Sequence, residues 1–299
     1  MIRSSAFLLQ KYPAARRWFI ASAVVSLLFF IYTAMYATGI LNQSTVEIER
    51  WLVGRPITRL DCSFLMWRQL GEAPMTAVVL LLLGVVCVLA GHRKRVLVYL
   101  LGLLFLAVVI EVVGKMLFTL PLPPNLRSGM TVLTCPQMQG QPFSVHLAAG
   151  LGLLGQVPNP PGQQVNWAHT VSQLPLLPST GDSENSFPGG HAMRWCLTGL
   201  VLAWICARYL RPRWSGRILM VICGLGAFLG GFMQMYIGVH FITDTIAGYL
   251  IGVALGCCAI GILIMNDTKT QPVRPVIPVQ DGNPAIDVAS EHSFSGQRR

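Results

Sequence analysis

The chain has 299 residues, of which 53% are hydrophobic and only 11% are charged, and its formal net charge is +10. Soluble domains carry charge on about a quarter of their residues, so this composition excludes an ordinary water-soluble fold and predicts a protein that crosses a membrane several times. The positive charge does not indicate nucleic-acid binding, because the aromatic residues lie inside apolar runs rather than among basic residues.

Six apolar runs are each about long enough for a helix to cross a hydrocarbon core of about 30 Å. The first run follows two arginines, as a signal peptide would, but it is longer than a signal core and no small-x-small cleavage site follows. We therefore expect an all-α membrane domain over residues 1–265 with six transmembrane helices. In chain order these helices cover Trp18–Leu41, Met75–Gly91, Val96–Leu117, His191–Ala207, Ile218–Val239 and Phe241–Met265.

Basic residues gather before the first expected span and in the short turns after the second and the fourth. Because basic loops stay on the cytoplasmic side, this pattern predicts cytoplasmic termini in an integral protein of the plasma (inner) membrane. The clusters are Arg3, Lys11, Arg16 and Arg17, then Arg93, Lys94 and Arg95, and then Arg208, Arg211, Arg213 and Arg217.

Two long polar stretches flank the fourth to sixth spans. The outer segment 118–190 contains 15 mostly apolar residues, 143–157, which are too few to span and are expected to form a lid over the outer face. Residues 266–299 are polar and without periodicity, so we expect a disordered cytoplasmic tail. Six of the eight cysteines fall in spans, and a disulfide between the other two, Cys62 and Cys135, is left open by their spacing.

Four ionisable residues from three separate stretches fall at the outer ends of the expected spans. Lys115 ends the third span, His191 opens the fourth, and His240 and Asp244 lie where the fifth passes into the sixth. Ionisable side chains are costly in a membrane and usually serve a function there. Their convergence predicts a catalytic site at the outer face.

The spacing of these residues indicates what each could do. His240 and Asp244 are four apart, so the carboxylate can hold one imidazole nitrogen and leave the other as a nucleophile or base, although Asp244 could instead be a helix N-cap. Gly189 and Gly190 precede His191 and can expose backbone N–H groups to an anion, unless they form only a turn. His191 would then be placed to protonate a leaving oxygen.

Three stretches resemble the motifs of a known family. They are "KMLFTLPLP" from Lys115, "PGGH" ending at His191 and "MQMYIGVHFITD" ending at Asp244. In order they resemble the K-x6-R-P, P-S-G-H and S-R-x5-H-x3-D motifs of the type 2 phosphatidic acid phosphatase superfamily, membrane lipid phosphatases related to vanadium haloperoxidases. The resemblance covers about residues 18–265. It implies that His240 takes the phosphoryl group, Asp244 orients it, His191 is the general acid and Lys115 binds phosphate oxygens.

The sequence departs from this pattern at both family arginines, which are replaced by Leu122 and Gln234, and at both family serines. Arg194 is a candidate replacement, because it follows the fourth-span histidine by three residues and needs an anionic partner, although it could also reach the interface. Arg127 is a second candidate, and Gln234 can still donate an uncharged hydrogen bond. Glu111, one turn before the lysine, is placed to pair with it.

Together these features predict hydrolysis of a lipid phosphate or diphosphate at the outer face through a phosphohistidine intermediate. The expected partners are the lipid substrate and the bilayer. No metal or other cofactor is expected, since lysine, arginine and backbone N–H groups supply the positive field. Two alternatives stay open. One is a head-group phosphotransferase similar to sphingomyelin synthase–like relatives, whose diester substrate needs fewer cations. The other is a catalytically inactive lipid-binding protein with the same fold.

Overall fold

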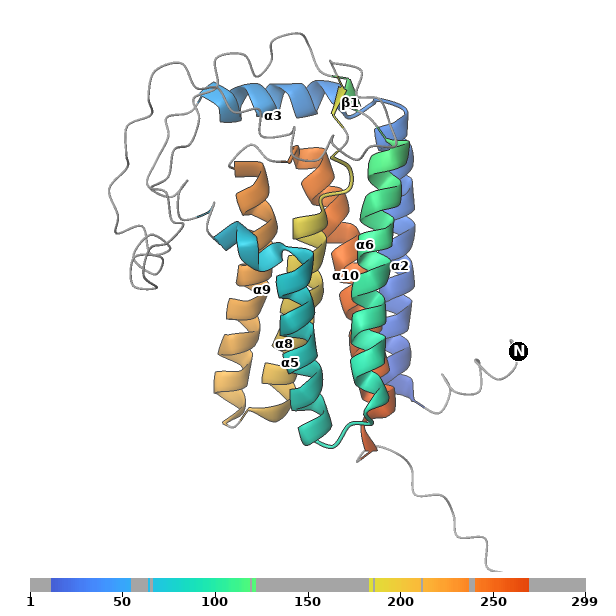
Figure 1. Cartoon of the computed structure of the whole chain (residues 1–299), viewed down its shortest axis with the longest axis vertical. Helices are drawn as coiled ribbons and strands as arrows, with labels where there is room; N and C mark the ends of the chain where they lie inside the picture. Colours follow the sequence, from blue (N-terminus) through green and yellow to red (C-terminus); the bar gives the residue numbers. More distant parts are fainter. Residues whose placement is uncertain are drawn as a thin grey trace, which may run out of the picture.

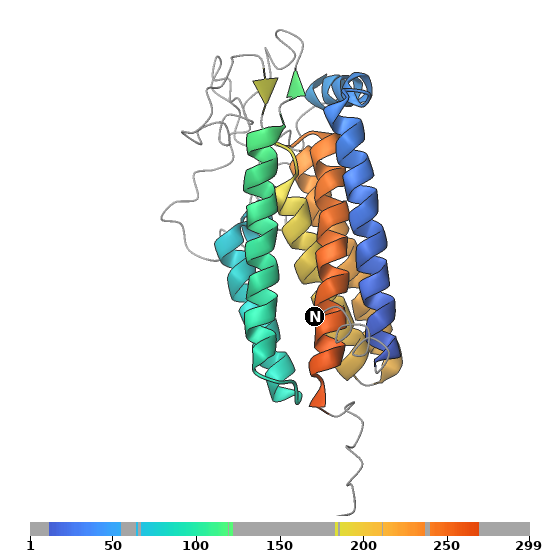
Figure 2. The ribbon, with the colours of Figure 1, turned by 90° about the vertical axis from the view of Figure 1, so that its right-hand side faces the viewer.

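The computed structural model describes residues 12–54, 64, 67–118, 120–121, 183–184, 186–210, 212–236 and 240–268. Six long helices run side by side in a bundle and a seventh lies across one end (Figures 1 and 2). The bundle helices are α2 (Pro13–Ala37), α5 (Ala73–Leu89), α6 (Arg95–Leu117), α8 (Gly190–Tyr209), α9 (Arg213–Tyr236) and α10 (Ile242–Asn266), and the crossing helix is α3 (Asn42–Gly54). The expected all-α character is confirmed for the described residues, apart from one short pair of strands.

The remaining described elements are short, and the strands lie near the end of the bundle that α3 crosses (Figure 1). A 3-10 helix, η1 (Arg68–Gly71), leads into α5. The strands β1 (Leu120–Pro121) and β2 (Ser183–Glu184) pair antiparallel and join the chain just after α6 to the chain just before α8. Together they bring the end of α6 and the start of α8 to one place.

Four of the bundle helices, α2, α6, α9 and α10, are long and apolar enough to cross a membrane by length and composition. Helix α5 is apolar but has 17 residues. Helix α8 has 20 residues and includes a histidine and two arginines. All six expected spans therefore occur as helices, while the crossing of a membrane by α5 and α8 stays a prediction.

Helix α10 is at the centre of the bundle and contacts α2, α6, α8 and α9. In the most apolar 18-residue stretch of α10, 61% of the residues are buried, whereas in that of α2 only 6% are buried. Helix α2 therefore turns most of its apolar side chains outward, as a lipid-facing helix would. Two glycines bring α10 against the backbone of α8. A Cβ atom at Gly252 would lie 2.6 Å from the carbonyl oxygen of Met193, and one at Gly248 would meet the Gly189 carbonyl. Small residues four apart allow helices in membranes to approach this closely.

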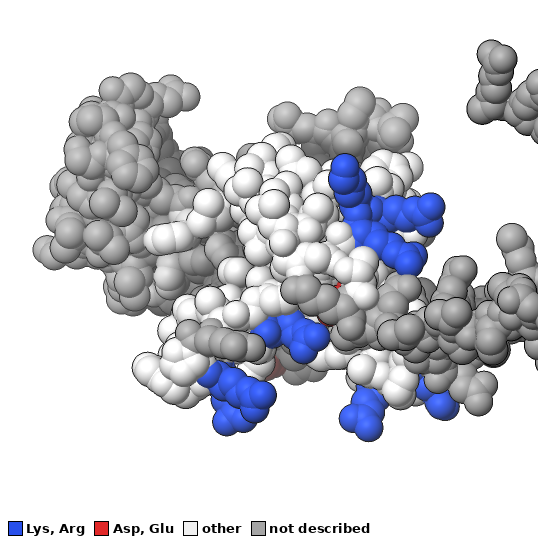
Figure 3. All heavy atoms as spheres, turned by 90° about the horizontal axis from the view of Figure 1, so that it is seen from below, with Lys and Arg blue, Asp and Glu red and all other residues white. Residues whose placement is uncertain are grey.

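The two ends of the bundle differ in charge. Seen from below, one end presents many Lys and Arg side chains and hardly any carboxylate (Figure 3). This basic end is formed by the start of α2 and the turns between α5 and α6 and between α8 and α9. The described basic clusters thus share one end, as the predicted orientation requires, although the side of the membrane that it faces stays a prediction. Their exposed members are Arg16, Arg17, Arg93, Lys94, Arg95, Arg208, Arg213 and Arg217.

Helix α3 lies across the opposite end and was not expected from the sequence, where the alternating charges of this stretch indicate a loop (Figure 1). It is amphipathic. Thr45, Glu49 and Leu52 are buried, whereas Trp51 on the other face is 67% exposed. The expected lid helix over residues 143–157, both cysteines of the possible disulfide and the tail beyond residue 268 lie outside the described residues.

Candidate active site

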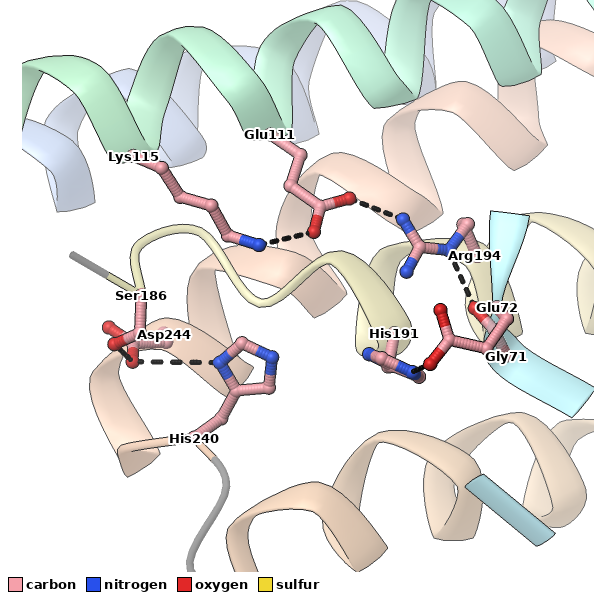
Figure 4. Close-up of polar contacts among 9 residues, drawn as sticks. All are labelled: Gly71, Glu72, Glu111, Lys115, Ser186, His191, Arg194, His240 and Asp244. Atoms are coloured by element: carbon pink, nitrogen blue, oxygen red, sulfur yellow. Dashed lines mark hydrogen bonds and ion pairs between the residues drawn. The ribbon is translucent and has the colours of Figure 1, made fainter. Parts of the chain in front are cut away.

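The predicted site residues meet at the end of the bundle away from the basic turns. Lys115 is in the last turn of α6, His191 and Arg194 are in the first turns of α8, and Asp244 is in the first turn of α10. His240 lies two residues before α10. Figure 4 shows these side chains converging from three helices. The structure thus brings together the four ionisable residues on which the sequence analysis is based.

His240 and Asp244 face each other at the start of α10. The Nδ1 atom of His240 lies 3.8 Å from Oδ2 of Asp244, and both residues are buried. The same carboxylate oxygen accepts hydrogen bonds from the hydroxyl of Ser186 and from the backbone N–H of Phe241, at 3.1 Å for the latter. Asp244 is the third residue of α10 rather than its N-cap, and the hydrogen bond that it accepts from Phe241 caps the helix beside His240; that it orients this histidine stays a prediction.

An acidic residue contacts the side of the His191 ring that lies away from His240. Its Nε2 atom lies 3.2 Å from the carboxylate of Glu72, the residue just before α5. Glu72 lies on the side of His191 that faces away from His240 (Figure 4). The other ring nitrogen, Nδ1, is buried and has no hydrogen-bond partner within the described part of the chain. One nitrogen is thus fixed by a carboxylate and the other is left for a ligand.

The four groups form a row of carboxylate, imidazole, imidazole and carboxylate. The ring centres of His191 and His240 are 6.1 Å apart, and each ring has its acidic partner on the outer side. Burial lowers the pKa of His240, so its ring is neutral near pH 7 and retains a lone pair. The hydrogen bond from His191 lowers the pKa of Glu72 to about 2, so this carboxylate stays ionised. The His240 ring is therefore neutral, and the Glu72 carboxylate at the far end of the row is charged.

A second cluster lies beside this row and contains the two cations. Glu111 in α6 accepts a hydrogen bond from the Lys115 ammonium at 2.6 Å and another from the Arg194 guanidinium. Arg194 also donates from Nε to the backbone oxygen of Gly71 at 2.6 Å, and its side chain is only 4% exposed. The prediction that Glu111 pairs with the lysine is confirmed. The anionic partner that Arg194 needs is thus supplied by Glu111, and the binding of a phosphate by the same guanidinium stays a prediction.

Gln234 replaces a family arginine and is fully buried at the end of α9. Neither atom of its carboxamide has a hydrogen-bond partner among the described residues. Its backbone oxygen accepts the N–H of His240 at 3.2 Å, so the end of α9 is hydrogen-bonded to the segment that carries His240. A buried, unpaired amide at this position is available for a ligand oxygen.

The glycines before α8 differ from expectation. The N–H of Gly189 donates to the carbonyl oxygen of Asp244 at 2.8 Å, so the prediction that it is free for an anion is wrong in this structure. A side chain at Gly190 would collide with the Glu111 carboxylate, so this glycine provides room for the acid beside the two cations. Arg127 lies outside the described residues.

Two site residues were missed from the sequence. They are Ser186, in the polar stretch before α8, and Glu72, directly before α5. A serine three residues ahead of the glycine pair and an acidic residue at the start of a span were the available signals, but neither spacing identifies a partner more than 50 residues away. Among the described residues, no three His, Cys, Asp or Glu side chains are grouped as metal ligands would be.

Comparison with known proteins adds to this geometry. The family profile of the PAP2 superfamily matches residues 96–267. A segment of 82 residues is 35% identical to phosphatidylglycerophosphatase B of Bacillus subtilis (strain 168), and it covers 27% of this chain and 40% of that protein. A crystal structure of a transmembrane PAP2-type phosphatidylglycerolphosphate phosphatase from Bacillus subtilis aligns over 85% of this chain and 99% of its own, with 16% identity and a TM-score of 0.48.

Proposed function

The chain belongs to the PAP2 superfamily, whose profile covers more than half of it, and from this premise we propose that it is a membrane lipid phosphatase that acts through a phosphohistidine. The observation that carries the proposal is the row in which His240 and His191 face each other between the carboxylates of Asp244 and Glu72. This arrangement supplies one basic and one acidic group on either side of a reacting phosphorus.

In the first half-reaction, the Nε2 lone pair of His240 attacks the phosphorus of the lipid phosphate. The bond from phosphorus to the ester or anhydride oxygen breaks, and its electron pair goes to the leaving oxygen. His191 donates a proton to that oxygen, and Asp244 stabilises the positive charge that develops on His240. His191 enters this step as the imidazolium, with Nε2–H donating to Glu72, and the proton on Nδ1 is the one transferred to the leaving oxygen.

In the second half-reaction, water replaces the lipid product. His191 now takes a proton from the water, whose oxygen attacks the phosphorus. The nitrogen–phosphorus bond breaks, its electrons return to His240, and inorganic phosphate leaves. The groups end in the states in which they began.

The non-reacting phosphate oxygens bind to Lys115, Arg194 and Gln234. Lys115 and Arg194 lie beside the row and supply charge-assisted hydrogen bonds, each worth about 1.5–3 kcal/mol. Gln234 supports this assignment because its buried amide has no partner among the described residues. Arg127 stays a further candidate ligand from the outer segment.

Transfer to a lipid alcohol is a second candidate, and Glu111 favours it. This acid pairs with both Lys115 and Arg194, so these three groups together carry one positive charge. A phosphodiester with one negative charge matches that field better than a phosphate dianion. The first half-reaction is the same, and only the acceptor of the phosphoryl group differs. We place the site at the outer face of the plasma (inner) membrane, since the basic end lies opposite.

Phosphate release by the purified full-length chain tests the proposal. The substrates are phosphatidate, a polyprenyl diphosphate and phosphatidylglycerophosphate, the last being suggested by the name of the similar bacterial enzyme. His240→Gln is compared with His92→Gln, which also replaces a buried histidine but at the basic end of the bundle. Labelled substrate followed by a quench in base, in which phosphohistidine survives, detects the intermediate.

Wild type and His92→Gln are expected to release phosphate, and wild type is expected to carry the label. His240→Gln should neither release phosphate nor become labelled. Release by His240→Gln at the wild-type rate refutes the assigned nucleophile. If wild type is labelled and loses the label only after an alcohol acceptor is added, with the label then found in the phosphorylated alcohol, the transferase is correct. If no lipid labels the protein, the inactive lipid-binding alternative holds.

A further inference from the structure

A cavity at the basic end of the bundle lies between the end of α8 and the start of α9, far from the site described above. Its volume is about 860 Å³, which falls in the range of small-ligand sites. Three arginines line it, together with the apolar or weakly polar residues Ala207, Leu210, Pro212 and Met220. The three arginines are Arg208, Arg213 and Arg217.

Two of these arginines lack a described counter-ion. Arg208 lies 3.4 Å from the carboxylate of Asp267, which offsets its charge. Within the described ranges, neither Arg213 nor Arg217 has a carboxylate within ion-pair distance. They are four apart in α9 and so share a face, where like charges destabilise a helix by a few tenths of a kcal/mol. An anion between the two guanidinium groups would remove that repulsion and accept paired hydrogen bonds, as phosphate does.

The surroundings of the cavity distinguish a lipid from a soluble anion. The next residues of α9 after the arginines carry exposed apolar side chains, which include Ile218, Val221 and Ile222 at 51%, 56% and 55% exposure. Trp214 is 64% exposed beside the arginines, where interfacial tryptophans of membrane proteins commonly lie. The cavity thus spans the change from a basic, polar surface to an apolar, lipid-facing one. An occupant with a phosphate at one end and hydrocarbon at the other fits both parts.

We propose that this cavity binds an anionic phospholipid from the leaflet at the basic end, with its phosphate between Arg213 and Arg217 and its acyl chains along the exposed apolar side of α9. Basic pockets between transmembrane helices bind anionic head groups in this way. The site is independent of the proposed catalysis, since it lies at the opposite end of the bundle and shares none of its residues. Basic residues at this end also orient the chain in the membrane. The experiment must therefore distinguish binding in the cavity from a general attraction of anionic lipid by the surface charge.

The experiment titrates delipidated, full-length protein in detergent with phosphatidylserine and counts bound lipid by native mass spectrometry. Arg213→Gln with Arg217→Gln removes the pair of charges in the cavity. Lys94→Gln with Arg95→Gln is the matched control, because it removes two exposed charges from the same end at the turn between α5 and α6, outside the cavity lining. Met220→Trp fills the cavity and keeps every charge. Phosphatidylcholine and inorganic phosphate serve as comparison ligands.

Loss of both arginines is expected to weaken phosphatidylserine binding about thirtyfold, as two interfacial charges would, while the control pair changes it by less than about threefold. Met220→Trp should also weaken binding, and phosphatidylcholine should bind poorly to all variants. Equal losses in the two double variants would overturn the site in favour of a diffuse surface charge. Binding of inorganic phosphate as strong as that of the lipid would overturn the lipid assignment, and unchanged binding in Met220→Trp would exclude the cavity.

Discussion

Replacement of Glu111 by glutamine tests the cluster that holds both cations. In wild type its carboxylate accepts from Lys115 at 2.6 Å and from Arg194, and the three side chains are 11%, 10% and 4% exposed. Removal of one partner from a buried ion pair costs about 3–5 kcal/mol. Glutamine keeps one acceptor oxygen for one of the two cations, so the lower end, about 3 kcal/mol, is expected. At roughly 2–4 °C per kcal/mol, the midpoint of thermal unfolding should fall by about 6–12 °C.

Added phosphate distinguishes the cause of this loss. An anion that enters between the uncovered cations stabilises the folded variant by mass action, so inorganic phosphate or vanadate should raise the midpoint of Glu111→Gln more than that of wild type. The assay is thermal unfolding in detergent over a series of phosphate concentrations. Glu47→Gln, the same change on the exposed face of α3, is the control and should match wild type. Equal midpoints for the two variants, or equal responses to phosphate, would refute the assigned pairing.

Three further changes follow from the structure. Ser186→Ala removes a hydrogen-bond donor from Asp244 and should lower kcat about tenfold with little change in KM in steady-state kinetics; an unchanged kcat would show that the hydroxyl does not position the carboxylate. The pKa of Glu72 is lowered to about 2, below the unfolded value of about 4.3, so its stabilising effect is complete above that value and is lost as the pH falls towards 2. Glu72→Gln should therefore unfold at a lower temperature than wild type at neutral pH and at the same temperature near pH 2; a difference that persists there argues against this linkage. Gly252→Ala brings a Cβ atom within 2.6 Å of a backbone oxygen and should cost about 1–3 kcal/mol in thermal unfolding, whereas Gly226→Ala, with nothing within 4 Å, should be neutral or slightly stabilising. Equal stability of the two glycine variants would show that the helices are not packed so closely.

The helices could be predicted from the sequence because an apolar run long enough to cross a membrane is a local pattern. The third span was expected to end at Leu117, where α6 ends. The first was expected to begin at Trp18, yet α2 begins at Pro13, since proline is favoured in the first turn and the following arginines continue the helix. Helix α3 was missed because its polar face dominates a short sequence, and only contact with the bundle shows which side is buried.

The candidate site was predictable in its parts but not in its pairings. The placement of Lys115, His191, His240 and Asp244 at one end follows from helix direction alone. The partners do not, because Arg194 meets Glu111 across 83 residues and His191 meets Glu72 across 119. Because the sequence shows no partner near Arg194, a buried arginine at this position indicated a bound ligand. The structure assigns that arginine an internal carboxylate, which changes the electrostatics expected for the bound phosphate.

The close contact of α8 with α10 has a consequence for how a lipid enters the site. With glycine at positions 248 and 252, the two helices meet at the backbone, and such tightly packed surfaces do not slide continuously past one another. Since His191 starts one helix and His240 precedes the other, the two histidines stand on a single rigid body. A ligand that enters the proposed site would therefore meet two histidines whose separation is already set by helix packing, and its binding would not need to bring the two rings together.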